Sequence, residues 1–149
     1  MDDKLLLFLR RALRFAITLV IVGVMLNDGV RLVTALSSGY GGLKDAANAA
    51  LDVASVAPND REGAQAAAAA AAAARGIQLV AYDQQVTEGT TSMQITVRLA
   101  VDAYVQRSIV IAPVVGLVRG TPSSEWYSGA GAPITLRQRK QVSYFSGSP

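Results

Sequence analysis

The sequence predicts an α+β protein in which a long N-terminal helix and alanine-rich helices accompany a small antiparallel sheet of about three strands. Three patterns in the 149 residues support this prediction. Residues 4–36 are helical in pattern, apolar at their centre and free of proline. Nine consecutive alanines, Ala66–Ala74, favour a second helix because alanine has the highest helix propensity. Apolar and polar side chains alternate over residues 93–105, which is typical of a half-buried strand.

The N-terminal helix contains the most apolar stretch of the chain. Phe15–Leu26, with the sequence FAITLVIVGVML, has twelve residues and no charge. A membrane-spanning helix needs about 20 apolar residues. The run is therefore long enough only if Arg14 snorkels to the headgroups and the apolar surface continues past Asp28. We predict a single transmembrane anchor over residues 12–36. The side chains that form it are Phe15, Ile17, Leu19, Val20, Ile21, Val22, Val24, Met25 and Leu26.

The charges around this run predict its orientation. Four basic side chains precede it: Lys4, Arg10, Arg11 and Arg14. This excess of positive charge places the basic N-terminus, residues 1–14, in the cytoplasm and the rest of the chain outside. At the outer end Asp28 and Arg31 are three residues apart on one helical face, so we expect an ion pair within the helix.

Two other interpretations of the same segment stay open. A cleaved secretory signal would have the same basic start and short apolar run, with a small-residue cleavage site near residues 35–37. A soluble core helix is also compatible with the length of the run. The mass of the mature protein separates a cleaved signal from a retained anchor.

A hinge and a folded head are predicted after the anchor. Residues 37–42, SSGYGG, contain three glycines and two serines, which favour a flexible hinge. We expect residues 43–149 to form an extracytoplasmic α+β head that begins with a helix over residues 43–57. Asn59 or Asp60 is expected to cap the alanine-rich helix that follows, which stops at Arg75-Gly76.

The sequence of the second half of the head indicates the strands of the sheet. A short strand over residues 77–83 is expected to pair as a hairpin with the long strand over residues 93–105. Residues 134–145 alternate again and predict a third strand. Between these strands, residues 107–118 fit either a broken strand or a short helix, because Pro113 and Gly116 interrupt an apolar run.

The residue inventory indicates no catalytic function. The chain has no Cys and no His, which removes the commonest nucleophiles, bases and metal ligands. We therefore predict no enzyme activity, cofactor, metal or small-molecule substrate. Residues 37–149 contain nine basic and eight acidic side chains, so this nearly neutral part of the chain predicts no nucleic-acid binding. Trp126 and Tyr127, in a loop over residues 120–133, form either an exposed recognition loop or a cover for one sheet edge.

Two motifs resemble those of the TadE/TadG-like minor pilins of tight-adherence (Flp, type IVc) pilus systems. Residues 43–51, LKDAANAAL, are close to the family's pattern after the anchor, and residues 28–31, DGVR, resemble the group that closes it. The resemblance implies a structural subunit of the bacterial cytoplasmic membrane that assembles with other pilin-like or pilus-assembly subunits and enters a surface pilus or secretion apparatus. The alternative is a membrane-tethered extracytoplasmic binding or sensor domain outside any filament.

Overall fold

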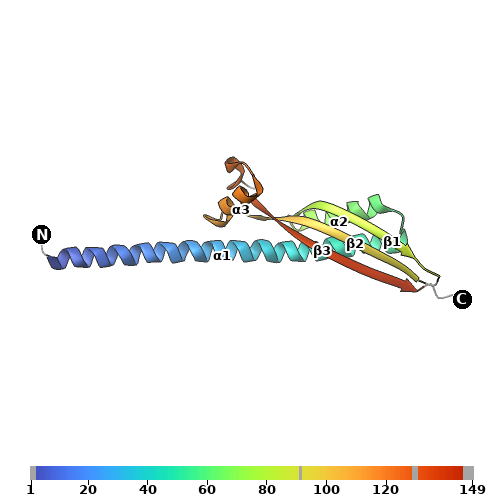
Figure 1. Cartoon of the computed structure of the whole chain (residues 1–149), viewed down its shortest axis with the longest axis horizontal. Helices are drawn as coiled ribbons and strands as arrows, with labels where there is room; N and C mark the ends of the chain where they lie inside the picture. Colours follow the sequence, from blue (N-terminus) through green and yellow to red (C-terminus); the bar gives the residue numbers. More distant parts are fainter. Residues whose placement is uncertain (1–2, 91, 129–130, 146–149) are drawn as a thin grey trace. The chain divides into compact units, whose positions relative to one another are not determined.

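The computed structural model describes residues 3–90, 92–128 and 131–145 and divides the chain into two units (Figure 1). The N-terminal unit comprises Met1–Val33 and Val105–Ala132; the sheet unit comprises Thr34–Tyr104 and Pro133–Pro149. The elements, in chain order, are α1 (Asp3–Val56), α2 (Arg61–Ala74), β1 (Gln78–Glu88), β2 (Ser92–Val105), α3 (Ile111–Arg119), the 3₁₀ turn η1 (Ser123–Glu125) and β3 (Ala132–Phe145).

The α+β class and the long N-terminal helix are confirmed within the described residues, with three α-helices and a three-stranded antiparallel sheet. The domain boundaries differ from the prediction. Residues 105–132 were placed in the head, but they group with the first part of α1. Of the two alternatives for residues 107–118, a broken strand or a short helix, the structure has the helix, α3.

The predicted hinge over residues 37–42 is wrong, because α1 continues through it without interruption for 54 residues. Two of its three glycines, Gly39 and Gly42, serve close packing instead of flexibility. A side chain at Gly39 would collide with Leu136 and Ala103, and one at Gly42 would collide with Ile77. These neighbours of the two glycines belong to strands and a loop far along the chain. The glycine pattern alone therefore could not distinguish a flexible hinge from a helix packed closely against other elements.

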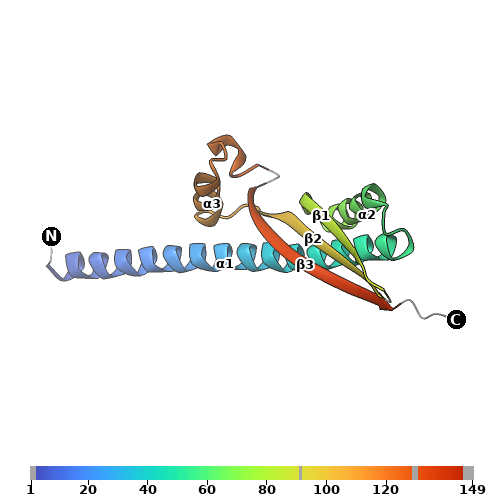
Figure 2. The ribbon, with the colours of Figure 1, turned by 45° about the vertical axis from the view of Figure 1, so that its right-hand side comes forward.

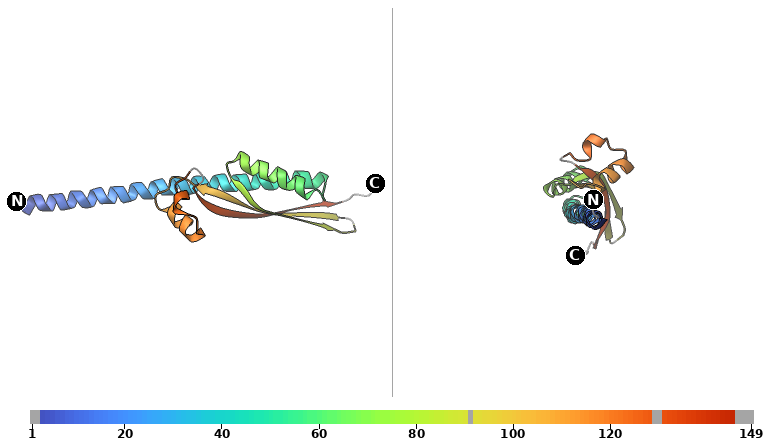
Figure 3. Two further views of the ribbon diagram at one scale, coloured as in Figure 1. Left: turned by 90° about the horizontal axis from the view of Figure 1, so that it is seen from above. Right: turned by 90° about the vertical axis from the view of Figure 1, so that its left-hand side faces the viewer.

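The core of the sheet unit lies between the sheet and the two helices that cover one of its faces (Figure 3). The last part of α1 buries its apolar side chains at the predicted helical spacing: Leu43, Ala46, Ala47, Ala50, Leu51 and Ala54. In α2 the alanines at positions 64, 68 and 72 are fully buried. They are four residues apart and form one stripe, which lets the helix approach its neighbours closely.

The ends of α2 confirm the predicted capping residues. Asp60 is the N-cap, and its Oδ1 accepts a hydrogen bond from the backbone N–H of Gly63 at 2.9 Å. This bond satisfies one of the donors that every helix leaves unpaired at its start. At the other end Gly76 has a φ of +70°, a conformation that glycine adopts without strain.

The sheet has the strand order β1-β2-β3, and β1 and β2 form the predicted hairpin. β1 is longer than the short strand that was predicted and reaches Glu88, where the Gly89 N–H donates to the Ser92 carbonyl at 2.8 Å. In β2 the apolar side chains predicted to share one face are Met93, Ile95, Val97, Leu99, Val101, Ala103 and Val105. Met93 is half-buried and the other six are buried. The alternation therefore identified the inner face correctly.

Replacing Gly39 by alanine should destabilise the sheet unit, and the same change at Gly41 should stabilise it. At Gly39 the new methyl group would lie 2.5 Å from Leu136 Cδ1 and 2.8 Å from Ala103 Cβ, whereas nothing lies within 4 Å at Gly41. We expect a loss of about 1–2 kcal/mol from overpacking for Gly39→Ala and a gain of up to about 1 kcal/mol for Gly41→Ala. Urea denaturation followed by circular dichroism measures both, and a gain for the two variants alike would contradict the packing role of Gly39.

Candidate functional site

The N-terminal unit is held together at Asp28, a carboxylate on α1 that is only 4% exposed. Its Oδ1 accepts a hydrogen bond from the Ile109 N–H at 2.7 Å, and its Oδ2 accepts from the N–H groups of Val110 at 2.8 Å and Ile111 at 3.3 Å. The Asn27 amide donates to Oδ1 at 3.2 Å. One side chain thus receives three consecutive backbone donors from a segment more than 80 residues further along the chain.

These donors belong to the start of α3, where a helix has backbone N–H groups without partners of its own. The N-cap residue, Val110, has no side chain that could accept them. Asp28 fills that role from another helix, and its negative charge also favours the positive end of the α3 dipole. The next N–H, of Ala112, donates to Ser108 Oγ at 2.5 Å. Every donor from Ile109 to Ala112 is therefore satisfied by a side-chain oxygen.

The predicted ion pair between Asp28 and Arg31 is not among the ion pairs of the residues that the structure describes. The spacing along α1 would allow it, but the carboxylate faces the start of α3 and its oxygens accept backbone N–H groups there. The sequence indicated that the Asp28 carboxylate needs a partner, and Arg31 was predicted because it is the nearest basic residue on the same helical face. The actual partner is distant in sequence, and no local signal at Asp28 indicates it.

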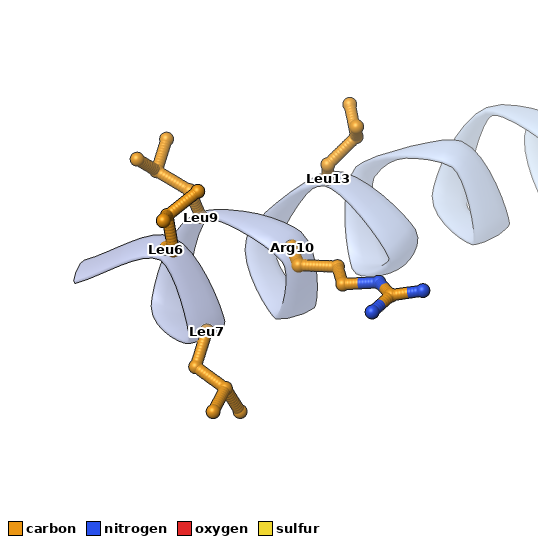
Figure 4. Close-up of a pocket in the computed structure, with 5 residues that line it drawn as sticks. All are labelled: Leu6, Leu7, Leu9, Arg10 and Leu13. Carbon is orange, nitrogen blue, oxygen red and sulfur yellow. The ribbon is translucent and has the colours of Figure 1, made fainter. Parts of the chain in front are cut away.

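The first part of α1 leaves its large apolar side chains exposed on all sides. Figure 4 shows this at one end, where Leu7 points away from the helix on the side opposite to Leu6, Leu9 and Leu13. These side chains and Arg10 outline an open depression on a single helix, which has no second wall and does not form a binding cavity. Of the predicted anchor residues, these are large and exposed: Phe15, Ile17, Leu19, Val20, Ile21, Val22, Met25 and Leu26.

By the usual requirement for apolar length, no helix in the described part of the chain qualifies as a membrane span.

Trp126 and Tyr127 lie beside α3, and the two rings differ in exposure. The Trp126 indole is packed so closely on Gly116 that a side chain there would collide with its Nε1, and this Nε1 donates to the Thr121 carbonyl at 2.9 Å. The Tyr127 ring is exposed, but its hydroxyl donates to the Ile109 carbonyl at 3.0 Å. Both aromatics therefore contact the segment that forms α3, Trp126 at Gly116 and Tyr127 at Ile109.

An exposed apolar stripe on α3 was not predicted. Its side chains are Val110, Val114, Leu117 and Val118. They follow the spacing i, i+4, i+7, i+8 that defines one side of a helix. This spacing is visible in the sequence, but it indicates a stripe only once residues 107–118 are known to be helical.

The polar side chains of the sheet unit pair with one another. Asp102 Oδ1 accepts from the Thr135 hydroxyl at 2.6 Å, and the Tyr82 hydroxyl donates to Gln84 Oε1 at 2.6 Å. Burial raises the pKa of the Tyr82 hydroxyl, which keeps it protonated for this bond. Among the described residues there is no buried side-chain nitrogen or oxygen without a partner and no cluster of acidic groups fit for a metal ion.

Comparison with protein-family models, characterised proteins and solved structures finds no match to this chain.

Removing the Asp28 carboxylate should release the start of α3. In Asp28→Ala the three backbone N–H groups lose their acceptor, and hydrogen bonds to a charged group are worth about 1.5–3 kcal/mol. Since about 1.4 kcal/mol is a factor of ten in an equilibrium constant, amide hydrogen exchange at residues 109–111 should accelerate at least about tenfold. Asp52→Ala, an exposed aspartate on the same helix, is the matched control and should leave these amides unchanged. Unaltered exchange in Asp28→Ala would refute the capping role.

Proposed function

We propose that this protein is a single-pass membrane-anchored, pilin-like structural subunit that acts by assembly with other subunits. The observation that supports the proposal most is the exposure of large apolar side chains around the whole circumference of α1 from Leu5 to Leu26. Soluble monomers rarely expose continuous apolar surface of this extent. Something must therefore cover this surface in the cell, and lipid covers a helix from all sides at once.

The proposed anchor depends on the two ends of the apolar run. Residues 12–29 contain only two ionisable side chains, Arg14 and Asp28, each close to one end. A helix of this length extends about 27 Å, compared with about 30 Å for the hydrocarbon core of a bilayer. Arg14 can extend its guanidinium to the headgroups, and Asp28 has its carboxylate satisfied by backbone donors, which lowers the cost of a position near lipid.

The orientation follows from charge. Arg10, Arg11 and Arg14 precede the apolar run, and only Arg31 follows it closely. By the positive-inside rule the N-terminus faces the cytoplasm and the sheet unit lies outside the cytoplasmic membrane.

The pilin-like role is supported by the motifs and by what they do in the fold. In the segment LKDAANAAL, residues 43–51, every apolar side chain except Ala49 lies in the core of the sheet unit. In DGVR, residues 28–31, Asp28 fixes α3. Both segments that resemble the TadE/TadG-like minor pilins therefore have a structural role. We accordingly propose a role in a tight-adherence pilus or a related secretion apparatus, with other pilin-like subunits as partners.

Deletion of the gene, followed by imaging of surface filaments and an assay of secretion, tests the assembly role. Loss of filaments or of secretion, restored by the wild-type gene, is expected. Normal filaments and secretion in the deletion strain would refute the pilin-like role and favour a tethered binding or sensor domain. Because the chain has no Cys, single cysteines placed along residues 12–26 would identify neighbouring subunits by cross-linking.

A charge in the middle of the apolar run should weaken anchoring. Val20 and Val56 are both on α1 and are 66% and 87% exposed, so neither substitution disturbs packing within the chain. An arginine at the centre of a spanning helix costs about 2.5–3.5 kcal/mol. This cost is a large share of the free energy of membrane insertion that a short apolar helix provides. Val20→Arg should therefore appear in the soluble fraction after alkaline carbonate extraction, whereas Val56→Arg should stay with the membranes as the wild type does. Equal retention of both variants would contradict the proposed span.

A further inference from the structure

We propose that α3 is a second membrane contact of this chain, lying on the bilayer surface with its apolar stripe inserted among anionic phospholipids. This inference rests on the proposed anchor and extends it to a segment about 80 residues further along the chain. The stripe consists of Val110, Val114, Leu117 and Val118 as defined above, and Ile109 next to it is exposed as well.

The stripe faces away from the protein. On the opposite side of α3, Ala112 and Gly116 are fully buried or nearly so, and Trp126 packs on Gly116. With that side occupied, Leu117 and Val118 are left 72% and 77% exposed. A helix that lies on a membrane also places its exposed apolar side at the boundary between headgroups and acyl chains.

The position of α3 is fixed relative to the end of the apolar run. Asp28, which binds its first N–H groups, comes two residues after Leu26, a rise of about 3 Å along the helix axis. The start of α3 therefore lies at the level where the proposed span leaves the bilayer. Figure 2 shows α3 as the part of the segment 105–132 nearest the N-terminal end of α1. The stripe thus begins at the level of that end of the apolar run.

The charges around the stripe favour an anionic partner, and the exposed apolar side chains between them favour anionic phospholipid as that partner. Arg107 precedes α3 and Arg119 ends it, and both are exposed. Arg31 lies one turn beyond Asp28 on α1, whereas residues 103–124 contain no Asp or Glu and the next acidic residue is Glu125 in η1. Basic residues beside inserted apolar side chains strengthen binding to anionic headgroups.

Single cysteines can report where the stripe lies, because the natural chain contains none. We would prepare the full chain as Leu117→Cys, Val20→Cys and Val56→Cys, label each with an environment-sensitive fluorophore, and reconstitute it in vesicles of phosphatidylethanolamine and phosphatidylglycerol. All three positions are exposed, so the label does not disturb packing within the chain. Lipids with quenchers at the headgroup or deep in the acyl chains, together with aqueous iodide, then measure the depth of each label.

The proposal expects the label at position 117 to be quenched most by the shallow lipid quencher, the label at position 20 by the deep one, and the label at position 56 by iodide. In a Leu117→Cys chain that also carries Val114→Asp and Val118→Asp, lipid quenching at position 117 should fall roughly tenfold. Deep quenching at position 20 should persist in this chain, which shows that the protein is still anchored.

Three results would overturn the proposal. If position 20 is quenched by lipid and position 117 by iodide alone, the anchor stands and α3 is free of the membrane. If position 117 is shielded from both lipid and iodide, a protein subunit or a second copy of the chain covers the stripe. If position 20 is accessible to iodide, the proposed anchor itself fails, and the membrane role of α3 fails with it.

Discussion

The N-terminal unit depends on one carboxylate. α3 has nine residues, too few to be stable as an isolated helix in water, and its N-cap residue is a valine with no hydrogen-bonding side chain. Asp28 supplies the missing acceptors from α1, and Ser108, Trp126 and Tyr127 add the remaining contacts. These contacts hold the segment between β2 and β3 in a defined conformation that includes a helix, although very few of its side chains are buried.

The regular elements were predictable because their signals are local. The alternation over β2, the N-cap at Asp60 and the helix-ending Gly76 each depend on residues within a few positions, and each was found where the sequence placed it. The buried positions at the end of α1 were predictable for the same reason, since the helical period alone determines which side chains share a face.

The errors occurred where a residue's role depends on a distant partner. Gly39 and Gly42 resemble a hinge in sequence, but their neighbours in space are Leu136, Ala103 and Ile77. Asp28 resembles half of an ion pair within a helix, but its partners begin at Ile109. In each case the local pattern was consistent with two roles, and only the tertiary contact decided between them. The stripe on α3 was missed because Pro113 and Gly116 made residues 107–118 compatible with a broken strand as well as with a helix.

The buried alanines of α2 have a thermodynamic consequence. Ala64, Ala68 and Ala72 are fully buried, but each exposes little apolar surface when the chain unfolds. The heat capacity change of unfolding scales with that newly hydrated surface. A sheet unit whose helix interfaces are built largely from alanine should therefore have a small heat capacity change for its size. Its stability curve would be broad and shallow, so its folded fraction would vary little across the temperatures at which a cell grows.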